Sequence, residues 1–153
     1  MTFPIGTRCR WLALCHVEYW GPMASIRKEI STRATGDDVW SALRDVGSLH
    51  TRLVPGFVTD TKLEGAARIV TFGNGMVVRE LIVTVDEVER RVVWSATGGS
   101  LTHHNSSAQV IAGSAGSTKV VWITDLLPDE AAETVEAMMD EGMAIMRRTL
   151  DEL

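Results

Sequence analysis

One β-rich segment of this 153-residue chain is interrupted by two adjacent histidines and three short polar residues, His103-His104-Asn105-Ser106-Ser107. If Gln109 faces solvent, alternation along the strand places His104 and Ser106 on the inner face. Since His103 then points the opposite way, the two imidazoles cannot bind one metal ion together. The inner imidazole could transfer a proton near neutral pH, or it could serve only as a structural hydrogen-bond partner.

A second polar interruption, Arg79-Glu80, lies in an otherwise apolar segment. Alternation sends one of the two side chains toward the core. We expect it to be Arg79, because Glu80 lies an even number of residues from Thr84 and Asp86, which should face solvent, and so should lie on their face. A buried guanidinium needs a negative partner, which a ligand carboxylate or phenolate would supply. The alternative is a structural ion pair with a carboxylate of the protein. The candidates for that pair are Asp60 and Glu64.

Two tryptophans in the middle of β-rich segments offer flat apolar surfaces. Because Lys119 should face water, alternation directs Trp122 inward, and Trp94 is expected to do the same. An indole in a pocket gives an apolar wall with one N–H donor, which suits stacked or ring-shaped ligands. Simple filling of the core is the alternative for either residue.

The elements that must position these side chains follow from hydrophobic periodicity. Ser25–Thr32 alternates as a strand, and Thr35-Gly36-Asp37-Asp38 starts a short amphipathic helix that ends at Gly47. Ser48–Leu53 is expected to form a second short helix before Pro55-Gly56. Six further β-rich segments are joined by short turns, which connect antiparallel neighbours. These segments are Phe57–Leu63, Ala67–Phe72, Met76–Asp86, Arg91–Thr97, Leu101–Ile111 and Thr118–Leu126.

A long final helix is predicted after Pro128, where a proline and two acids suit the first turn. Its apolar residues advance by three or four and form one stripe, which must be buried against the sheet. Four of the chain's seven methionines lie on that stripe, and methionine adapts to varied apolar shapes. They line either an ordinary core or a cavity wall. These methionines are Met138, Met139, Met143 and Met146.

The order of elements is β-α-α-β-β-β-β-β-β-α, and three stretches make a resemblance specific: Glu89–Trp94, Gly116–Trp122 and the helix led by Pro128. In these features the chain resembles the START-like superfamily called SRPBCC, nearest its polyketide cyclase/dehydratase-like branch. The resemblance covers about residues 24–153. It implies an α+β helix-grip fold, in which a curved seven-stranded antiparallel sheet wraps around the long C-terminal helix and encloses a cavity for an apolar or aromatic molecule.

Composition excludes several other classes of protein. Fifteen lysines and arginines against 20 aspartates and glutamates give a net charge of −5 with no basic stripe, which disfavours nucleic-acid binding. No apolar run approaches the roughly 20 residues of a membrane-spanning helix. Phosphate-binding, dinucleotide-binding and zinc-protease motifs are missing, so neither a cofactor nor a metal ion is expected.

Residues 1–23 differ from the rest of the chain in composition and pattern, because they contain both cysteines and show no clear periodicity. We expect them to be an N-terminal extension outside a single domain of residues 24–153, with Met23 as the natural start. The rest of the chain has no cysteine and therefore no disulfide framework, which fits a cytoplasmic protein.

Three functions compete. The chain binds a lipid-like or polyketide-like molecule in an internal cavity, or it is a cyclase, aromatase or dehydratase that uses the same cavity, or it is a protein-interaction module. Whether it is a monomer or a homodimer stays open. The catalytic candidates are His104 and Arg79. The ligand-contacting candidates are Arg79, Trp94, His104, Ser106, Trp122, Met139, Met143 and Met146.

Overall fold

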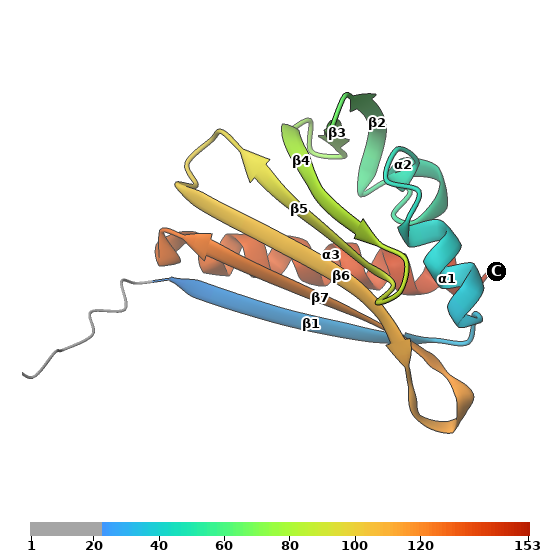
Figure 1. The fold of residues 1–153 in the computed structure, drawn as a ribbon. Helices are drawn as coiled ribbons and strands as arrows, with labels where there is room; N and C mark the ends of the chain where they lie inside the picture. Colours follow the sequence, from blue (N-terminus) through green and yellow to red (C-terminus); the bar gives the residue numbers. More distant parts are fainter. Residues whose placement is uncertain (1–22) are drawn as a thin grey trace, which may run out of the picture.

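The computed structural model describes residues 23–153, so the predicted extension lies outside the described residues except for Met23. The described chain folds as the expected α+β helix-grip, with seven antiparallel strands, a long C-terminal helix and two short helices between the first two strands (Figure 1). The strands are β1 (Ala24–Thr32), β2 (Val58–Glu64), β3 (Ala67–Phe72), β4 (Val77–Asp86), β5 (Arg91–Thr97), β6 (His103–Ala112) and β7 (Thr118–Leu127).

The first helix begins where its sequence offers a capping side chain and acids. In α1 (Gly36–Leu43), the hydroxyl of Thr35 accepts a hydrogen bond from the backbone N–H of Asp38, and acids occupy the first turn. A single-turn helix, α2 (Leu49–Arg52), follows. One 3₁₀ turn precedes α3 (Ala132–Leu150), so the regular helix begins later than the proline suggested.

The sheet order is β1-β7-β6-β5-β4-β3-β2, which leaves β1 and β2 at the two edges. Every strand from β2 to β7 pairs with its neighbour in sequence, as short turns require. The first strand closes the order by pairing along its whole length with the last, from Ala24–Leu126 to Thr32–Thr118. Register shifts interrupt β2 between Val58 and Asp60 and β4 between Ile82 and Thr84, and such bulges bend a sheet.

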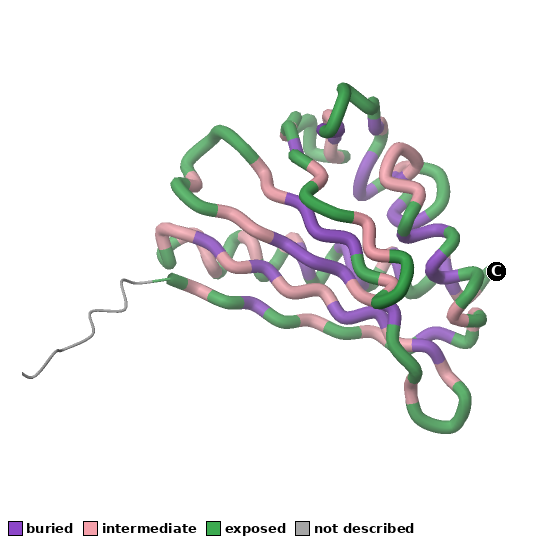
Figure 2. The backbone as a smooth tube through the Cα atoms, viewed as in Figure 1, coloured by how far each residue is buried: buried purple, intermediate pink, exposed green. Residues whose placement is uncertain are grey.

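The inner face of the sheet is covered in two halves. The long helix α3 runs along the β1 and β7 side, whereas α2 lies against β2 and α1 contacts β6 (Figure 1). Buried residues follow the centres of β5, β6 and β7 (Figure 2). A smaller cluster of Ile26, Leu126 and Met139 lies under the first half of α3, and the larger cluster joins α1, α2 and the second half of α3.

The end of α3 is tied to the end of β1 by one carboxylate. Asp151 Oδ1 accepts hydrogen bonds from the Thr32 hydroxyl at 2.8 Å and from the Arg33 backbone N–H at 3.0 Å. These donors, the Arg33 N–H first, lower the pKa of Asp151 below its ordinary value, because they stabilise the charged form. The tether therefore depends on an ionised side chain.

We expect Asp151→Asn to remove part of the acid sensitivity of the fold. A lowered pKa in the folded state adds stability that is complete above the unfolded pKa of about 3.9 and disappears as pH falls through the folded value. Thermal unfolding followed from pH 6 to pH 2 should show a smaller loss for the variant than for the wild type. Asp129→Asn, a matched change on an exposed turn, should behave as the wild type does. Equal acid sensitivity of all three proteins would contradict the tether.

Candidate functional site

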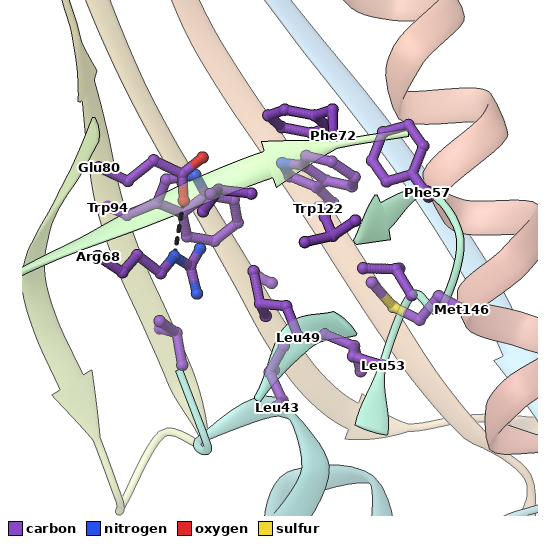
Figure 3. Close-up of a pocket in the computed structure, with 15 residues that line it drawn as sticks. Leu43, Leu49, Leu53, Phe57, Arg68, Phe72, Glu80, Trp94, Trp122 and Met146 are labelled. Carbon is purple, nitrogen blue, oxygen red and sulfur yellow. Dashed lines mark hydrogen bonds and ion pairs between the residues drawn. The ribbon is translucent and has the colours of Figure 1, made fainter. Parts of the chain in front are cut away.

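A small cavity lies between the two covered halves of the sheet. Its volume is about 70 Å³, and its wall is formed by the short helices, the inner faces of β2 to β7 and the second half of α3 (Figure 3). Most of the wall is apolar, with a single ion pair at one side. The lining residues are Leu43, Leu49, Leu53, Val54, Phe57, Val58, Arg68, Val70, Phe72, Glu80, Val92, Trp94, Ala108, Trp122 and Met146.

The ion pair joins Arg68 of β3 to Glu80 of β4, directly across the strand pairing. Arg68 Nε donates to Glu80 Oε2 at 2.7 Å, and Arg68 Nη1 donates to the Val46 carbonyl at 3.3 Å. The guanidinium also lies 5.3 Å from the centre of the Trp94 ring, within cation–π range. Both side chains are buried, at 5% and 10% exposure. The cavity wall thus has one charged, hydrogen-bonding region in an apolar surround.

The predicted inward orientation of Arg79 is wrong. Its side chain is 47% exposed and its Nε lies 3.4 Å from Glu64 Oε2, which is the structural pairing considered as the alternative. The cause is the bulge between Ile82 and Thr84, which shifts the alternation by one residue. Counting back from Thr84 in steps of two therefore assigns Glu80 to the wrong face of the strand. Glu80 is the residue that points inward.

Arg68 was not among the predicted site residues, although the alternation of β3 indicates its direction. It lies two and four residues from Val70 and Phe72, on the same face of the strand, and all three line the cavity. An inward arginine needs a negative partner, and Glu80 of β4 was available. Recognising the pair needed the register between β3 and β4, which the sequence alone does not provide.

Trp94 and Trp122 both point inward and line the cavity from neighbouring parts of the sheet (Figure 3). Their ring centres are 5.9 Å apart and their planes are tilted by 48°. The Trp122 indole Nε1 is buried without a hydrogen-bond partner among the described residues. A buried donor without an acceptor is unfavourable, so this N–H has a free capacity for a polar atom.

The three candidate methionines separate into two environments. Met146 lines the cavity, whereas Met139 packs with Ile26 and Leu126 in the smaller cluster. Met143 is 3% exposed and belongs to the larger core cluster, outside the cavity wall. The stripe is therefore mostly ordinary core, and the cavity touches it at one methionine.

His104 and Ser106 lie on the inner side of β6 but do not line the cavity. The His104 Nδ1 atom accepts a hydrogen bond from the Ala96 backbone N–H at 3.0 Å, so the proton of the neutral ring is on Nε2. Nε2 lies 3.2 Å from Ser106 Oγ, which lies 2.6 Å from Thr124 Oγ1. In this tautomer the imidazole donates to the serine and cannot take its proton, so the pair lacks the arrangement of a nucleophile and its base.

Burial lowers the pKa of His104, and the nearby imidazole of His103 lowers it further. Desolvation disfavours the charged form, and a proton on Nδ1 would also displace the Ala96 hydrogen bond. The ring is consequently neutral in the folded protein near neutral pH. Its role in the geometry is structural: it joins the end of β5 to β6 where their backbone pairing stops at Trp94 and Ser106.

Residues 23–153 contain no group of three or more histidine, cysteine, aspartate or glutamate side chains close enough to hold a metal ion. No helix in the same part of the chain is both long and apolar enough to cross a membrane.

Comparison with known proteins gives one family and a consistent fold. The family model described as "Polyketide cyclase / dehydrase and lipid transport" matches residues 23–151. A search of curated proteins returned no match.

Several solved structures share the fold at low sequence identity. An uncharacterised protein from Bacillus thuringiensis superposes with a TM-score of 0.74 at 19% identity, covering 83% of this chain and 98% of the other. The protein XoxI from Bacillus cereus also gives 0.74 at 19% identity, covering 83% and 95%. Norcoclaurine synthase from Thalictrum flavum, in complex with dopamine and hydroxybenzaldehyde, gives 0.66 at 18% identity, covering 85% of each chain.

Because His104 is neutral and buried, we expect the stability of the fold to depend on pH. Because the folded pKa is lowered, the contribution of His104 is complete above the unfolded value of about 6.5 and is lost as pH falls through the folded value. Urea unfolding at pH 7.5 and pH 5.0 should show a smaller pH difference for His104→Gln than for the wild type. His103→Gln, which changes the exposed neighbour, should keep most of that difference. A full difference in His104→Gln would contradict the buried neutral ring.

The ion pair predicts a non-additive mutational response. Arg68→Met leaves Glu80 buried and unpaired, so we expect the free energy of unfolding to fall by about 3–5 kcal/mol. The double variant Arg68→Met/Glu80→Leu should recover to within about 1 kcal/mol of the wild type, because no unpaired charge remains. Arg79→Met, which removes an exposed arginine, should cost under about 1 kcal/mol. Chemical denaturation of the four proteins checks the pattern, and a double variant no more stable than Arg68→Met would contradict it.

Proposed function

We propose that this chain, which belongs to the polyketide cyclase/dehydrase and lipid transport family, binds an apolar or aromatic small molecule bearing an oxygen acceptor in the cavity beside Arg68. The supporting observation is the composition of the wall: one buried guanidinium, stacked near an indole, in an otherwise apolar lining. A guanidinium has five N–H donors, and among residues 23–153 only two of its nitrogens have hydrogen-bond partners. The remaining nitrogen, Nη2, is the natural partner for a ligand carbonyl, phenolate or carboxylate.

The shape of the wall favours flat ligands. Two tilted indoles and two phenyl rings surround the space, and aromatic faces of this kind pack well against ring systems. Norcoclaurine synthase, which has the same fold, was solved with the aromatic compounds dopamine and hydroxybenzaldehyde. That precedent supports a ring-shaped guest, whereas the identity of the guest follows from the polar groups of this chain.

The size of the cavity sets a condition on binding. An engineered cavity of about 150 Å³ admits benzene, and ligand pockets generally measure about 300–1,000 Å³. A space of about 70 Å³ is therefore too small for a lipid or a polyketide as it stands. Binding requires some lining side chains to move, and the mobile candidates are the rings and the thioether that face the space, Phe57, Phe72 and Met146.

The proposal assigns no reaction. Cyclase or dehydratase chemistry needs a proton donor or acceptor beside the reacting atoms. His104, the predicted candidate, does not line the cavity and holds its proton toward Ser106. Binding is accordingly the function that these contacts support best.

The test compares 2-naphthoate with naphthalene by isothermal titration calorimetry. We expect the wild type to bind 2-naphthoate about tenfold more tightly, because a charge-assisted hydrogen bond to Arg68 adds roughly 1.5 kcal/mol or more. The double variant Arg68→Met/Glu80→Leu should lose this preference and keep its affinity for naphthalene. Arg79→Met serves as the matched control, since it removes an arginine outside the cavity.

Two results would contradict the proposal. An unchanged preference in the double variant would show that Arg68 does not contact the ligand. Absence of binding by the wild type to naphthalene, 2-naphthoate and a panel of fatty acids and phenolic compounds would exclude the cavity as a small-molecule site.

A further inference from the structure

A second hollow lies outside the cavity, and the two share a wall. This outer hollow has a volume of about 280 Å³ and is bounded by the loop before β2, the β3–β4 turn and α3. Among the residues that the structure describes, Phe57 and Phe72 alone line both spaces. The remaining residues that line the outer hollow are Gly56, Gly73, Asn74, Met138 and Glu141.

The wall consists of two side chains on a fixed backbone. The rings of Phe57 and Phe72 meet edge to face, with centres 5.3 Å apart and planes at 82°. The Gly73 N–H donates to the Phe57 carbonyl at 2.9 Å, and the Gly75 N–H donates to the Phe72 carbonyl at 2.9 Å. A Cβ on Gly73 would clash with the Gly56 carbonyl oxygen, so the two loops touch backbone to backbone. Rotation of the two rings would connect the two spaces.

Gly142 of α3 provides the seat for one of these rings. A Cβ at this position would lie 3.1 Å from Phe57 Cε1 and 3.2 Å from Trp122 Cζ3. The helix therefore omits a side chain where the Phe57 ring and the Trp122 ring approach it, at a cost of about 1 kcal/mol relative to alanine in an ordinary helix. The Phe57 ring therefore packs against the helix at Gly142, where no side chain projects between them.

The two hollows differ in chemistry. The inner one is apolar apart from the Arg68–Glu80 pair, whereas the outer one presents the Asn74 amide, the Glu141 carboxylate and the backbone of Gly56 and Gly73. Within the described chain no lysine or arginine lines the outer hollow. The Asn74 oxygen already accepts a hydrogen bond from the Met76 backbone N–H, so its amide nitrogen is the free polar atom, and Glu141 is the charged residue of this lining. An uncharged or cationic group therefore fits better there than an anionic one.

We infer that the ligand site spans both hollows, with Phe57 and Phe72 as its movable partition. It takes an amphipathic molecule whose largely apolar body lies inside, with its oxygen acceptor beside Arg68, and whose uncharged or cationic end lies against Asn74 and Glu141. This inference rests on the proposed function and specifies its ligand. It also resolves the size problem, because the joined spaces reach the range of ordinary ligand pockets.

The experiment uses 1-naphthylmethylamine and its uncharged counterpart, 1-methylnaphthalene, with the whole chain. Stopped-flow quenching of tryptophan fluorescence gives association rates. We expect Phe57→Ala to accelerate association of both probes on the order of tenfold, because binding no longer waits for a ring to rotate. Phe72→Leu provides a second, milder opening of the partition. Leu126→Ala, a core truncation at a residue that lines neither hollow, should leave the rate unchanged.

The charge at the outer end is tested at equilibrium. Glu141→Gln should weaken binding of 1-naphthylmethylamine about two- to fivefold, the range of an exposed ion pair, and leave 1-methylnaphthalene unaffected. Glu133→Gln, the same change elsewhere on α3, should alter neither probe.

The outcomes separate the inference from the proposed function. If the probes bind but neither Phe57→Ala nor Phe72→Leu changes the association rate, the partition is wrong while the inner site stands. An equal response of both probes to Glu141→Gln would likewise overturn the amphipathic arrangement. If 2-naphthoate binds the wild type and neither probe does, the inference fails while the proposed function stands. If none of the three compounds binds, both fail.

Discussion

The architecture depends on a mismatch of widths. Seven strands spaced about 4.8 Å apart make a face of roughly 29 Å, whereas one helix with its side chains is about 10–12 Å across. The long helix α3 can therefore cover only one side of the concave face, and two short helices cover the other. The seam between them must be filled by side chains that reach from the sheet. Trp94 and Trp122 have the size to do so, and they fill the seam incompletely.

Most of the fold could be predicted because its signals are local. Period-two segments, turn residues and one long amphipathic stripe specify the seven strands, the antiparallel pairing of consecutive strands from β2 to β7, and α3, and the structure has each of them. The pairing of β1 with β7 joins distant parts of the chain and was not specified by these signals. The boundary of β6 was predicted two residues too early, since the chain does not enter the strand until His103. Such errors arise where a polar segment can belong to a strand or to the turn before it.

The site was less predictable because it depends on register. A bulge in β4 carries no obvious sequence signature, yet it exchanges the faces of Arg79 and Glu80. Alternation without a bulge did hold for Trp94 and Trp122. The sequence could not show which methionines of the stripe line the cavity, because a cavity wall and an ordinary core are both built of apolar residues. Only the packing in the structure separates Met146, in the cavity wall, from Met139, in the core. For His104, the decisive feature is which nitrogen carries the proton, and that is set by the Ala96 backbone N–H.

The polar groups inside the domain are few, and each has a distinct environment. The chain from His104 through Ser106 to Thr124 satisfies itself and holds a strand junction together. The Arg68–Glu80 pair is different, because it faces open space and leaves donors unused. Burying two charges is costly even when they are paired, and well-packed apolar residues would serve stability equally well. A charged pair in that position makes sense where another molecule completes its contacts.

The two indoles have a consequence for observing the protein. Chromophores whose centres lie 5.9 Å apart at a 48° tilt exchange excitation energy and absorb as a coupled pair. Any guest that enters between or beside them changes that coupling, and the unpaired N–H of Trp122 reports a new hydrogen bond through its emission. The interior of this domain thus contains its own spectroscopic label, which makes occupancy visible without chemical modification.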